Sequence, residues 1–148
     1  MDLLRQLYGT VTITATVQRE ALQTGAPATL RQFVACPQAW LVIVDDVQPY
    51  LSETSALDPG EASAITLAWQ HRESSLLIMD EKRGRRVSMA LGLRITGAAG
   101  MLTDAAAAGL IDFEATFQRL ALTKFRLADP LVEILRNRHQ AKVFPPAI

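Results

Sequence analysis

Short runs of apolar and β-branched residues alternate along the chain with longer segments whose apolar positions follow a helical period. Such alternation is typical of crossover units around a parallel sheet. Four runs predict strands, at residues 11–14, 41–44, 76–79 and 93–96. The run at 76–79 contains no polar residue, which predicts a central strand covered on both faces. The pattern therefore predicts an α/β fold with a parallel sheet.

The ends of the helical segments are marked by residues that cap helices. The segment DPGE at 58–61 has an N-cap residue, a proline in the first turn and an acid at the third helical position, and it predicts a helix start. Gly92 and Gly109 follow apolar helical segments and predict helix ends. The predicted helices cover residues 3–8, 17–23, 61–71, 85–91, 101–108, 113–122 and 131–138.

Composition limits the number of domains and the classes of partner. A chain of 148 residues, of which 49% are apolar, can bury one core, so we expect a single domain over 1–148, with a core at 1–142 and a tail at 143–148. Lys and Arg number 15 and Asp and Glu number 15, so no net charge draws the chain to nucleic acid or to an anionic membrane. Any nucleic-acid contact must come from a local patch.

Cysteine content and hydropathy indicate a compartment. Cys36 is the only cysteine, which excludes an intramolecular disulfide and fits a reducing environment. The sequence has neither a signal-peptide pattern nor an apolar run long enough to span a bilayer. We therefore expect a soluble cytoplasmic protein without a membrane partner.

Carboxylates at the ends of elements are the best candidates for chemistry. Asp80 directly follows the run at 76–79, at the sheet edge where ligand sites gather, although a residue that caps the next helix would suit the same position. Glu61 is the third residue of a predicted helix, and a role in capping that helix is enough to explain an acid at this position. Glu20 lies within a predicted helix, where an exposed acid is the ordinary interpretation. Glu81 follows Asp80, and at most one of these two is expected to face the site.

Basic residues crowd the segment after Asp80. The cluster consists of Lys82, Arg83, Arg85 and Arg86. Such a cluster fits contacts with the phosphates of a nucleic-acid backbone, but a solvated helix start explains the same charge pattern. His71 and His139 lack the spacing of a zinc site, and no serine lies in a nucleophile-elbow pattern.

Asp45 and Asp46 form a rival acid pair, because paired aspartates at a strand end hold magnesium in phosphoacceptor receiver domains. Asp80 and Thr96 would then be the phosphorylated residue and the switch hydroxyl. The spacing fits poorly, since 44 residues precede Asp45 and the interval from Asp80 to Thr96 leaves room for only one short helix. The receiver interpretation is the weaker alternative.

Three segments together resemble a family of PIN domains. They are LDPGEASAI at 57–65, LLIMDEKRGRRV at 76–87 and ALGLRITG at 90–97. The resemblance extends from Asp2 to about Arg136, and the middle segment is its most specific part. The branch it resembles comprises predicted nucleic-acid-binding proteins of bacteria and archaea, related to the toxin ribonucleases of toxin–antitoxin pairs. This resemblance implies a PIN-like α/β/α sandwich around a parallel sheet.

The resemblance also implies a metal site. In these domains acids from separate segments bind magnesium or manganese for cleavage of RNA, and hard oxygen ligands favour Mg²⁺ or Mn²⁺ over zinc. The matching catalytic and metal-binding positions are Glu20, Glu61 and Asp80, with Glu81 in support. The basic cluster would hold the RNA backbone without reading its sequence. We expect a metal-dependent ribonuclease, a toxin of a toxin–antitoxin pair, with an antitoxin protein and a second copy of the chain as further partners.

One part of the family pattern is not in this sequence. PIN domains of this branch begin with a strand that ends in aspartate, whereas this sequence opens on the predicted helix at 3–8. We therefore expect a fold with its N-terminal strand missing, a site without its first aspartate, and weak cleavage or none. The alternative is a non-catalytic dimer that binds a partner or nucleic acid and has kept only the fold.

Overall fold

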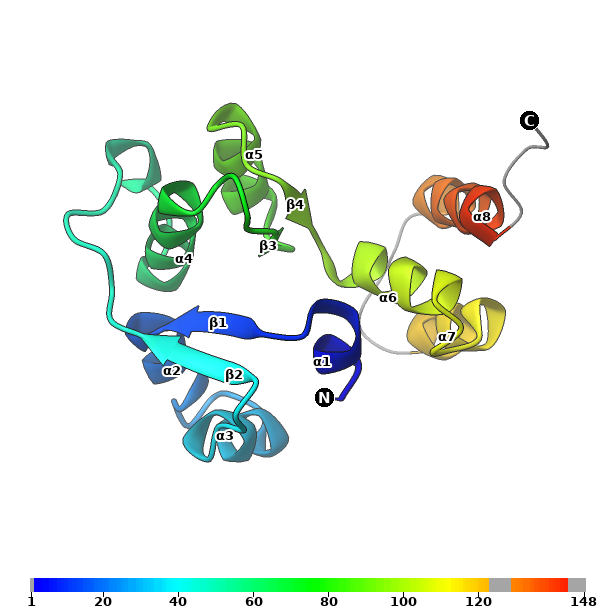
Figure 1. The fold of residues 1–148 in the computed structure, drawn as a ribbon, viewed down its shortest axis with the longest axis horizontal. Helices are drawn as coiled ribbons and strands as arrows, with labels where there is room; N and C mark the ends of the chain where they lie inside the picture. Colours follow the sequence, from blue (N-terminus) through cyan, green and yellow to red (C-terminus); the bar gives the residue numbers. More distant parts are fainter. Residues whose placement is uncertain (1, 123–128, 144–148) are drawn as a thin grey trace. The chain divides into compact units, whose positions relative to one another are not determined.

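A computed structural model describes residues 2–122 and 129–143 of the chain, and Figure 1 shows the order of the elements. The chain divides into two compact units, one up to Thr96 and one from Gly97 onward. The single domain over 1–148 stays a prediction, and the predicted tail at 143–148 lies outside the described residues from position 144. Among the described helices, none is long and apolar enough to cross a bilayer.

The strands of the first unit pair in parallel, as their apolar runs predict. Strand β1 (Val11–Thr14) pairs residue by residue with β2 (Leu41–Val44), beginning with Val11 opposite Leu41. Strand β3 (Leu77–Ile78) pairs with β4 (Ile95–Thr96). Within the described residues these are two separate two-stranded sheets. The predicted α/β class with parallel strands is confirmed.

The run at 76–79 does not form the central strand, covered on both faces, that its lack of polar residues predicts. Leu76 lies outside the strand and is 41% exposed, while Leu77 and Ile78 are half-buried. Met79, just after the strand, is buried. The prediction is wrong because an apolar run alone does not distinguish a strand between two neighbours from a strand paired on one side.

Helices surround these strands, and several begin where capping residues predict them. The described helices of the first unit are α1 (Asp2–Tyr8), α2 (Ala15–Ala21), α3 (Ala28–Ala35), the short 3₁₀ helix η1 (Ser52–Thr54), α4 (Pro59–Gln70) and α5 (Lys82–Ala90). Helix α4 begins with the predicted capping box between Asp58 and Glu61. Helix α5 ends before Gly92, whose φ of 72° is a conformation that glycine adopts without strain.

The core of the first unit forms where helix α4 packs against its neighbours. Ile65 and Ala68 of α4 meet Met79 and Leu93, and Ile65 is completely buried. Helix α4 contacts β1, β3 and α5. Burial of these apolar side chains therefore fixes the start of α4 near the segments that carry the predicted acids.

The second unit is helical in its described part. Its helices are α6 (Ala98–Ala107), α7 (Phe113–Ala121) and α8 (Asp129–Val143). Their core consists of Ala106, Phe113, Phe117 and Leu135. Asp112 caps α7, because its side chain accepts a hydrogen bond from the Ala115 N–H at 2.7 Å.

Candidate functional site

Helix α2 carries Glu20 to the start of helix α4. The Glu20 Oε1 atom accepts a hydrogen bond from the Gly60 backbone N–H at 2.9 Å, across 40 positions of sequence. A Cβ atom on Gly60 would lie 2.1 Å from Glu20 Oε2, so the lack of a side chain at this position permits the approach. The carboxylate thereby lies at the positive end of the α4 dipole.

Glu61 follows Gly60, so its side chain leaves the same turn of helix α4. Its Oε2 atom accepts a hydrogen bond from the Asp58 N–H at 3.4 Å, as part of the capping box. Its Oε1 atom is shielded from solvent and accepts no hydrogen bond within the described residues. A Cβ atom on Gly84 would lie 2.8 Å from Glu61 Oε1, which places this oxygen against the first turn of helix α5. Two of the predicted acids, Glu20 and Glu61, thus both lie at the first turn of α4.

Asp80 and Glu81 lie between strand β3 and helix α5, and both are exposed. Glu81 is the N-cap residue of α5, so capping of this helix does not explain Asp80. The Arg85 Nη1 atom donates to the Met79 carbonyl oxygen at 2.7 Å, which ties α5 to the residue before Asp80. Among the described residues no three acid, histidine or cysteine side chains gather as a group able to hold a metal ion. The predicted acids therefore do not form a ready-made three-ligand site.

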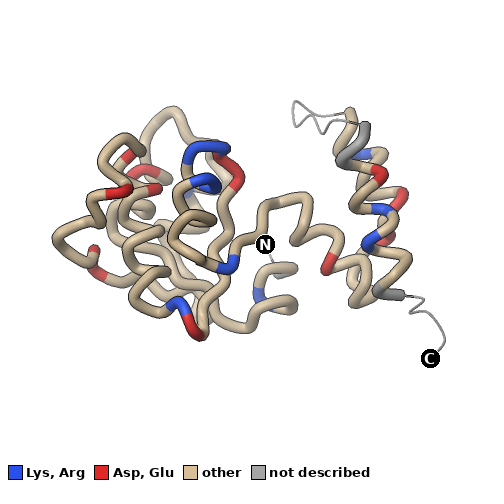
Figure 2. Tube along the Cα trace, turned by 90° about the horizontal axis from the view of Figure 1, so that it is seen from above, with Lys and Arg blue, Asp and Glu red and all other residues tan. Residues whose placement is uncertain are grey.

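The basic cluster lies on helix α5, next to these acids. Figure 2 shows basic and acidic segments side by side at the start of this helix. Lys82, Arg83 and Arg86 are exposed, whereas Arg85 is half-buried and bonded to the Met79 carbonyl. Cations in the first turn of a helix are opposed by the helix dipole, so they do not stabilise α5. Their position favours contact with an anionic partner.

A buried hydroxyl network beneath the acids was not predicted. Thr14 at the end of β1 and Ser63 in α4 are 1% and 0% exposed, and their hydroxyl oxygens lie 2.7 Å apart. Thr14 Oγ1 also accepts from the Val17 N–H at 3.2 Å, and Ser63 Oγ donates to the Gly60 carbonyl oxygen at 2.8 Å. The only sequence signal is a hydroxyl residue at a strand end and another on a small-residue helix face, which is too common to be used.

The rival acid Asp46 has a different role. It accepts hydrogen bonds from the Thr16 N–H, at 3.0 Å, and from the hydroxyls of Thr16 and Tyr50. Burial opposes the charged form, but these hydrogen bonds outweigh it and lower the pKa of Asp46 below its ordinary value. Asp46 thus links the segment after β2 to the first turn of α2. This use of its carboxylate is structural and does not support the receiver interpretation.

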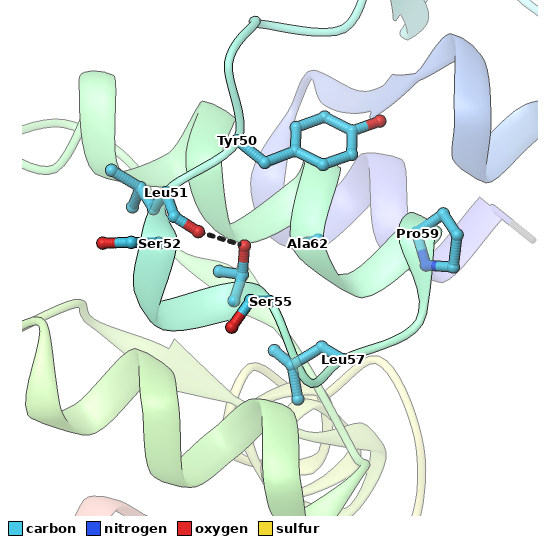
Figure 3. Close-up of a pocket in the computed structure, with 8 residues that line it drawn as sticks. Tyr50, Leu51, Ser52, Ser55, Leu57, Pro59 and Ala62 are labelled. Carbon is cyan, nitrogen blue, oxygen red and sulfur yellow. Dashed lines mark hydrogen bonds between the residues drawn. The ribbon is translucent and has the colours of Figure 1, made fainter.

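A hollow of about 260 Å³ lies beside η1 and the start of α4 (Figure 3). Its apolar lining includes Leu51, Leu57, Pro59 and Ala62. The Thr54 hydroxyl, also in the lining, donates to the Leu51 carbonyl oxygen at 2.7 Å. None of the predicted acids or basic residues is among the described residues that line it. The described lining residues therefore do not include the predicted metal ligands, although Pro59 and Ala62 flank the turn that carries Glu61.

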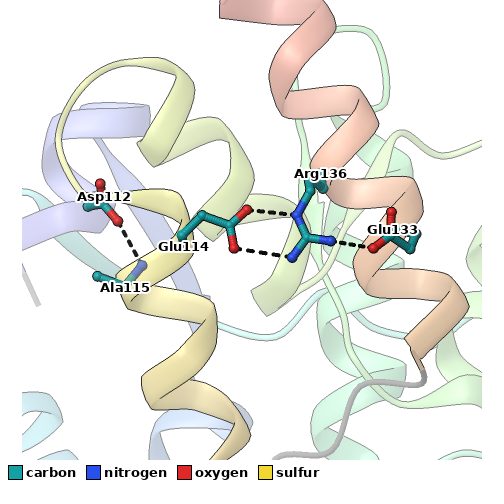
Figure 4. Close-up of polar contacts among 5 residues, drawn as sticks. All are labelled: Asp112, Glu114, Ala115, Glu133 and Arg136. Atoms are coloured by element: carbon teal, nitrogen blue, oxygen red, sulfur yellow. Dashed lines mark hydrogen bonds and ion pairs between the residues drawn. The ribbon is translucent and has the colours of Figure 1, made fainter.

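The second unit has a charged network of its own (Figure 4). Arg136 of α8 donates to both carboxylate oxygens of Glu114, at 2.7 and 3.1 Å, and also to Glu133. The hydrogen bond from Arg136 lowers the pKa of Glu114, and the same bond raises the pKa of Arg136. The network joins α7 to α8 and contains none of the predicted site residues.

The chain has an α/β fold in which helices pack around parallel strands and acids follow strand ends. Proteins of this class can bring carboxylates together at a strand end. Over residues 1–140 the chain matches the family described as DUF3368: PIN domain, and it belongs to that family. The resemblance drawn from the three sequence segments is confirmed. Neither the curated proteins nor the solved structures contain a match to the chain. PIN domains in general have a nuclease-like fold, bind nucleic acid and use divalent metals.

Proposed function

We propose that this chain is a metal-dependent ribonuclease that hydrolyses RNA phosphodiester bonds with Mg²⁺ or Mn²⁺. The observation that carries the proposal is Glu61 Oε1, which is shielded from solvent and has no hydrogen bond within the described residues. A shielded carboxylate oxygen without a partner costs free energy, and a bound cation would supply that partner. The Glu20 carboxylate lies at the neighbouring residue, Gly60.

The donor set suits a hard divalent cation. Carboxylate oxygens are the ligands that Mg²⁺ and Mn²⁺ prefer. The residues that would hold the cation are Glu20, Glu61 and Asp80, with Glu81 in support. Glu20 is exposed, and its Oε1 atom accepts the Gly60 N–H, which leaves Oε2 for the cation.

A bound cation would polarise a phosphoryl oxygen and lower the pKa of the attacking water. The chain's own residues would hold and orient the RNA. Lys82, Arg83 and Arg86 are exposed on helix α5, where they can contact phosphates on either side of the scissile bond. We assign Arg85 a different part, because its bond to the Met79 carbonyl fixes the peptide that precedes Asp80.

The same proposal includes a biological setting. The resemblance to toxin ribonucleases supports a toxin of a toxin–antitoxin pair that acts in the cytoplasm with an antitoxin protein and as a homodimer. Light scattering of the purified chain tests the homodimer. A mass of twice 16.2 kDa would support it, and a mass near 16.2 kDa would contradict it.

A second candidate is a nucleic-acid-binding protein without catalysis. It is favoured by the placement of the acids, because no three potential ligands gather among the described side chains. In this case Glu20 and Glu61 would serve only the start of helix α4, since Glu20 accepts from the Gly60 N–H and Glu61 from the N–H of the N-cap residue Asp58. The basic cluster of α5 would then bind RNA that the protein does not cleave.

Cleavage of labelled single-stranded RNA separates the two candidates. The assay compares Mg²⁺, Mn²⁺ and a chelator for the wild type, Glu61→Gln, Asp80→Asn and the matched control Glu73→Gln, whose side chain is 94% exposed. The ribonuclease proposal predicts weak, chelator-sensitive cleavage that is lost in either site variant and is unchanged in the control. RNA binding without cleavage in both metals would contradict it and support the second candidate.

The salt dependence of RNA binding separates the exposed cations from Arg85. A variant that no longer neutralises one phosphate of single-stranded RNA should show a slope of log K against log salt that is shallower by about 0.7, and we expect this for Arg83→Gln. Arg85→Gln should leave the slope unchanged and reduce the cleavage rate. An equal decrease of the slope in both variants would show that Arg85 contacts the RNA directly.

A further inference from the structure

A continuous series of hydrogen bonds runs through the buried hydroxyls beneath Glu20 and Glu61. The Val17 N–H donates to Thr14 Oγ1 at 3.2 Å, Thr14 Oγ1 and Ser63 Oγ lie 2.7 Å apart, and Ser63 Oγ donates to the Gly60 carbonyl at 2.8 Å. Thr14 is 1% exposed and Ser63 is 0% exposed. Neither hydroxyl can therefore exchange its partner for bulk water.

The direction of these bonds follows from the number of protons. A serine hydroxyl carries one proton, and Ser63 gives that proton to the Gly60 carbonyl oxygen. The bond between the two hydroxyls must therefore use the Thr14 proton. The lone pairs of Thr14 remain to accept the Val17 N–H. Each hydroxyl thus donates once, and bonds arranged head to tail in this way strengthen one another.

The hydrogen bonds close into a ring through Glu20 and the backbone of helix α2. Gly60 accepts from Ser63 with its carbonyl and donates to Glu20 Oε1 with its N–H at 2.9 Å. Glu20 in turn lies on helix α2, whose start is capped by Thr14. The ring therefore couples the helix that carries Glu20 to the turn that carries Glu61.

We infer that Thr14 and Ser63 are positioning residues that fix the Glu20 carboxylate relative to Glu61. The inference rests on the proposed metal site and extends it to two residues that would touch neither cation nor RNA. Removal of the Ser63 hydroxyl leaves the buried Thr14 proton without its acceptor and breaks the link between the residue that caps α2 and the first turn of α4. Helix α2 then no longer holds Glu20 at a fixed distance from the Gly60 N–H.

Another buried hydroxyl provides the matched control. Thr103 of helix α6 is 0% exposed, and its hydroxyl donates to the Ala99 carbonyl oxygen of the same helix at 2.9 Å. Thr103→Val and Thr14→Val remove the same atom from equally buried sites. They differ in that the Thr14 hydroxyl connects separate elements, whereas the Thr103 hydroxyl bonds within one helix.

Manganese affinity and amide exchange test the inference in the full chain. Electron paramagnetic resonance titration gives the Mn²⁺ dissociation constant, and NMR gives hydrogen exchange of the Gly60 amide relative to the core amide of Ile65. Ser63→Ala and Thr14→Val should raise the dissociation constant about 10- to 100-fold and accelerate exchange at Gly60. Thr14→Ser, which keeps the hydroxyl, and Thr103→Val should remain near the wild type in both measurements.

Unchanged Gly60 exchange in Ser63→Ala would overturn the inference, whatever the Mn²⁺ dissociation constant, because Glu20 would have kept its place. A wild type that does not bind Mn²⁺ would overturn the proposed function, and Gly60 exchange would still decide whether Ser63 positions Glu20. If Ser63→Ala does not fold, the double variant Thr14→Val with Ser63→Ala carries the same test, because it leaves no hydroxyl proton unpaired between the two sites.

Discussion

The two polar networks of the molecule use different groups in different surroundings. In the first unit, Thr14 and Ser63 are neutral and almost completely buried. In the second unit, Arg136 holds Glu114 and Glu133 through charged groups whose side chains are 31% to 64% exposed. A buried group that loses its partner cannot turn to water, whereas an exposed ion pair can be replaced by solvent at little cost. The neutral network is therefore the one that we expect to define local geometry.

The two networks also differ in the elements that they connect. The hydroxyl ring connects residues 49 positions apart and includes the Glu20 carboxylate of the proposed site. The ion pairs connect helices α7 and α8, which already share an apolar core. Charge is the more visible signal in a sequence, but we propose that here the uncharged groups position Glu20.

Removal of a buried hydroxyl should have the largest effect on stability. Ser63→Ala should lower the free energy of unfolding by about 1 to 3 kcal/mol, because it leaves a buried donor unpaired. Trp40 and Trp69 are the two tryptophans and both belong to the first unit, so urea unfolding followed by tryptophan fluorescence reports on that unit. The double variant Thr14→Val with Ser63→Ala should lose less unfolding free energy than the sum of the losses in the two single variants. A decrease in the unfolding free energy of less than about 0.5 kcal/mol for Ser63→Ala would contradict the expected difference between buried hydroxyls and exposed ion pairs.

Gly60→Ala should affect the site more than stability. Its Cβ would lie 2.1 Å from Glu20 Oε2, the far end of a flexible side chain, so Glu20 would turn away. The absence of this hydrogen bond, about 1 kcal/mol, is offset by about 0.5 to 1 kcal/mol gained when alanine replaces a helical glycine. The unfolding free energy should change by less than about 1 kcal/mol, while Mn²⁺ affinity falls.

The matched control for this substitution is Gly25→Ala, because a Cβ at Gly25 would have no atom within 4 Å. Calorimetric titration with Mn²⁺ should distinguish the two variants. Equal affinities in Gly60→Ala and Gly25→Ala would remove Glu20 from the proposed ligand set.

The parts of the fold that could be predicted are those with local signals. The strands at 11–14 and 41–44 are short apolar runs, and the start of α4 follows from the capping box at Asp58. Helix α3 was not predicted, although Leu30, Phe33 and Val34 follow the spacing of one helix face. Its start has no capping side chain at Pro27, and only Val34 of the helix is buried, so this short segment carries a weak signal.

The candidate acids could be predicted, but their surroundings could not. Asp80 follows an apolar run and Glu61 follows a capping motif, so both attract attention in the sequence. The partner of Glu20 is a backbone N–H 40 positions away, and a backbone group has no sequence signature. The Oε1 atom of Glu61, unpaired among the described residues, could not be predicted either, because capping already explained the acid and the approach of this oxygen to Gly84 depends on tertiary packing.

Asp46 adds a charged group to the comparison within the first unit. Its hydrogen bonds lower its pKa, so the unfolded chain binds its proton more tightly than the native state. The resulting stabilisation is complete above the ordinary pKa of 3.8 and is lost as the pH falls through the lower native value. Between about pH 5 and pH 3 the wild type should lose more unfolding free energy than Asp46→Asn, measured by urea unfolding with tryptophan fluorescence. Equal losses would show that Asp46 contributes no charge-dependent stability.

The smallest effect should come from Arg136→Gln in the second unit. The Arg136 pairs are exposed, and salt at about 1 M reduces the screening length to about 3 Å, so any stabilisation by charge should disappear there. Hydrogen exchange at the core amides of Phe117 and Leu135 should differ slightly from the wild type at low salt and not at all at high salt. Arg138→Gln is the control, because Arg138 approaches Asp104 only to 3.9 Å. A contrary result would be that Arg136→Gln accelerates hydrogen exchange in the second unit more than Ser63→Ala accelerates it in the first unit. Exposed charged groups would then control local geometry more than buried hydroxyls, which is the reverse of the proposed order.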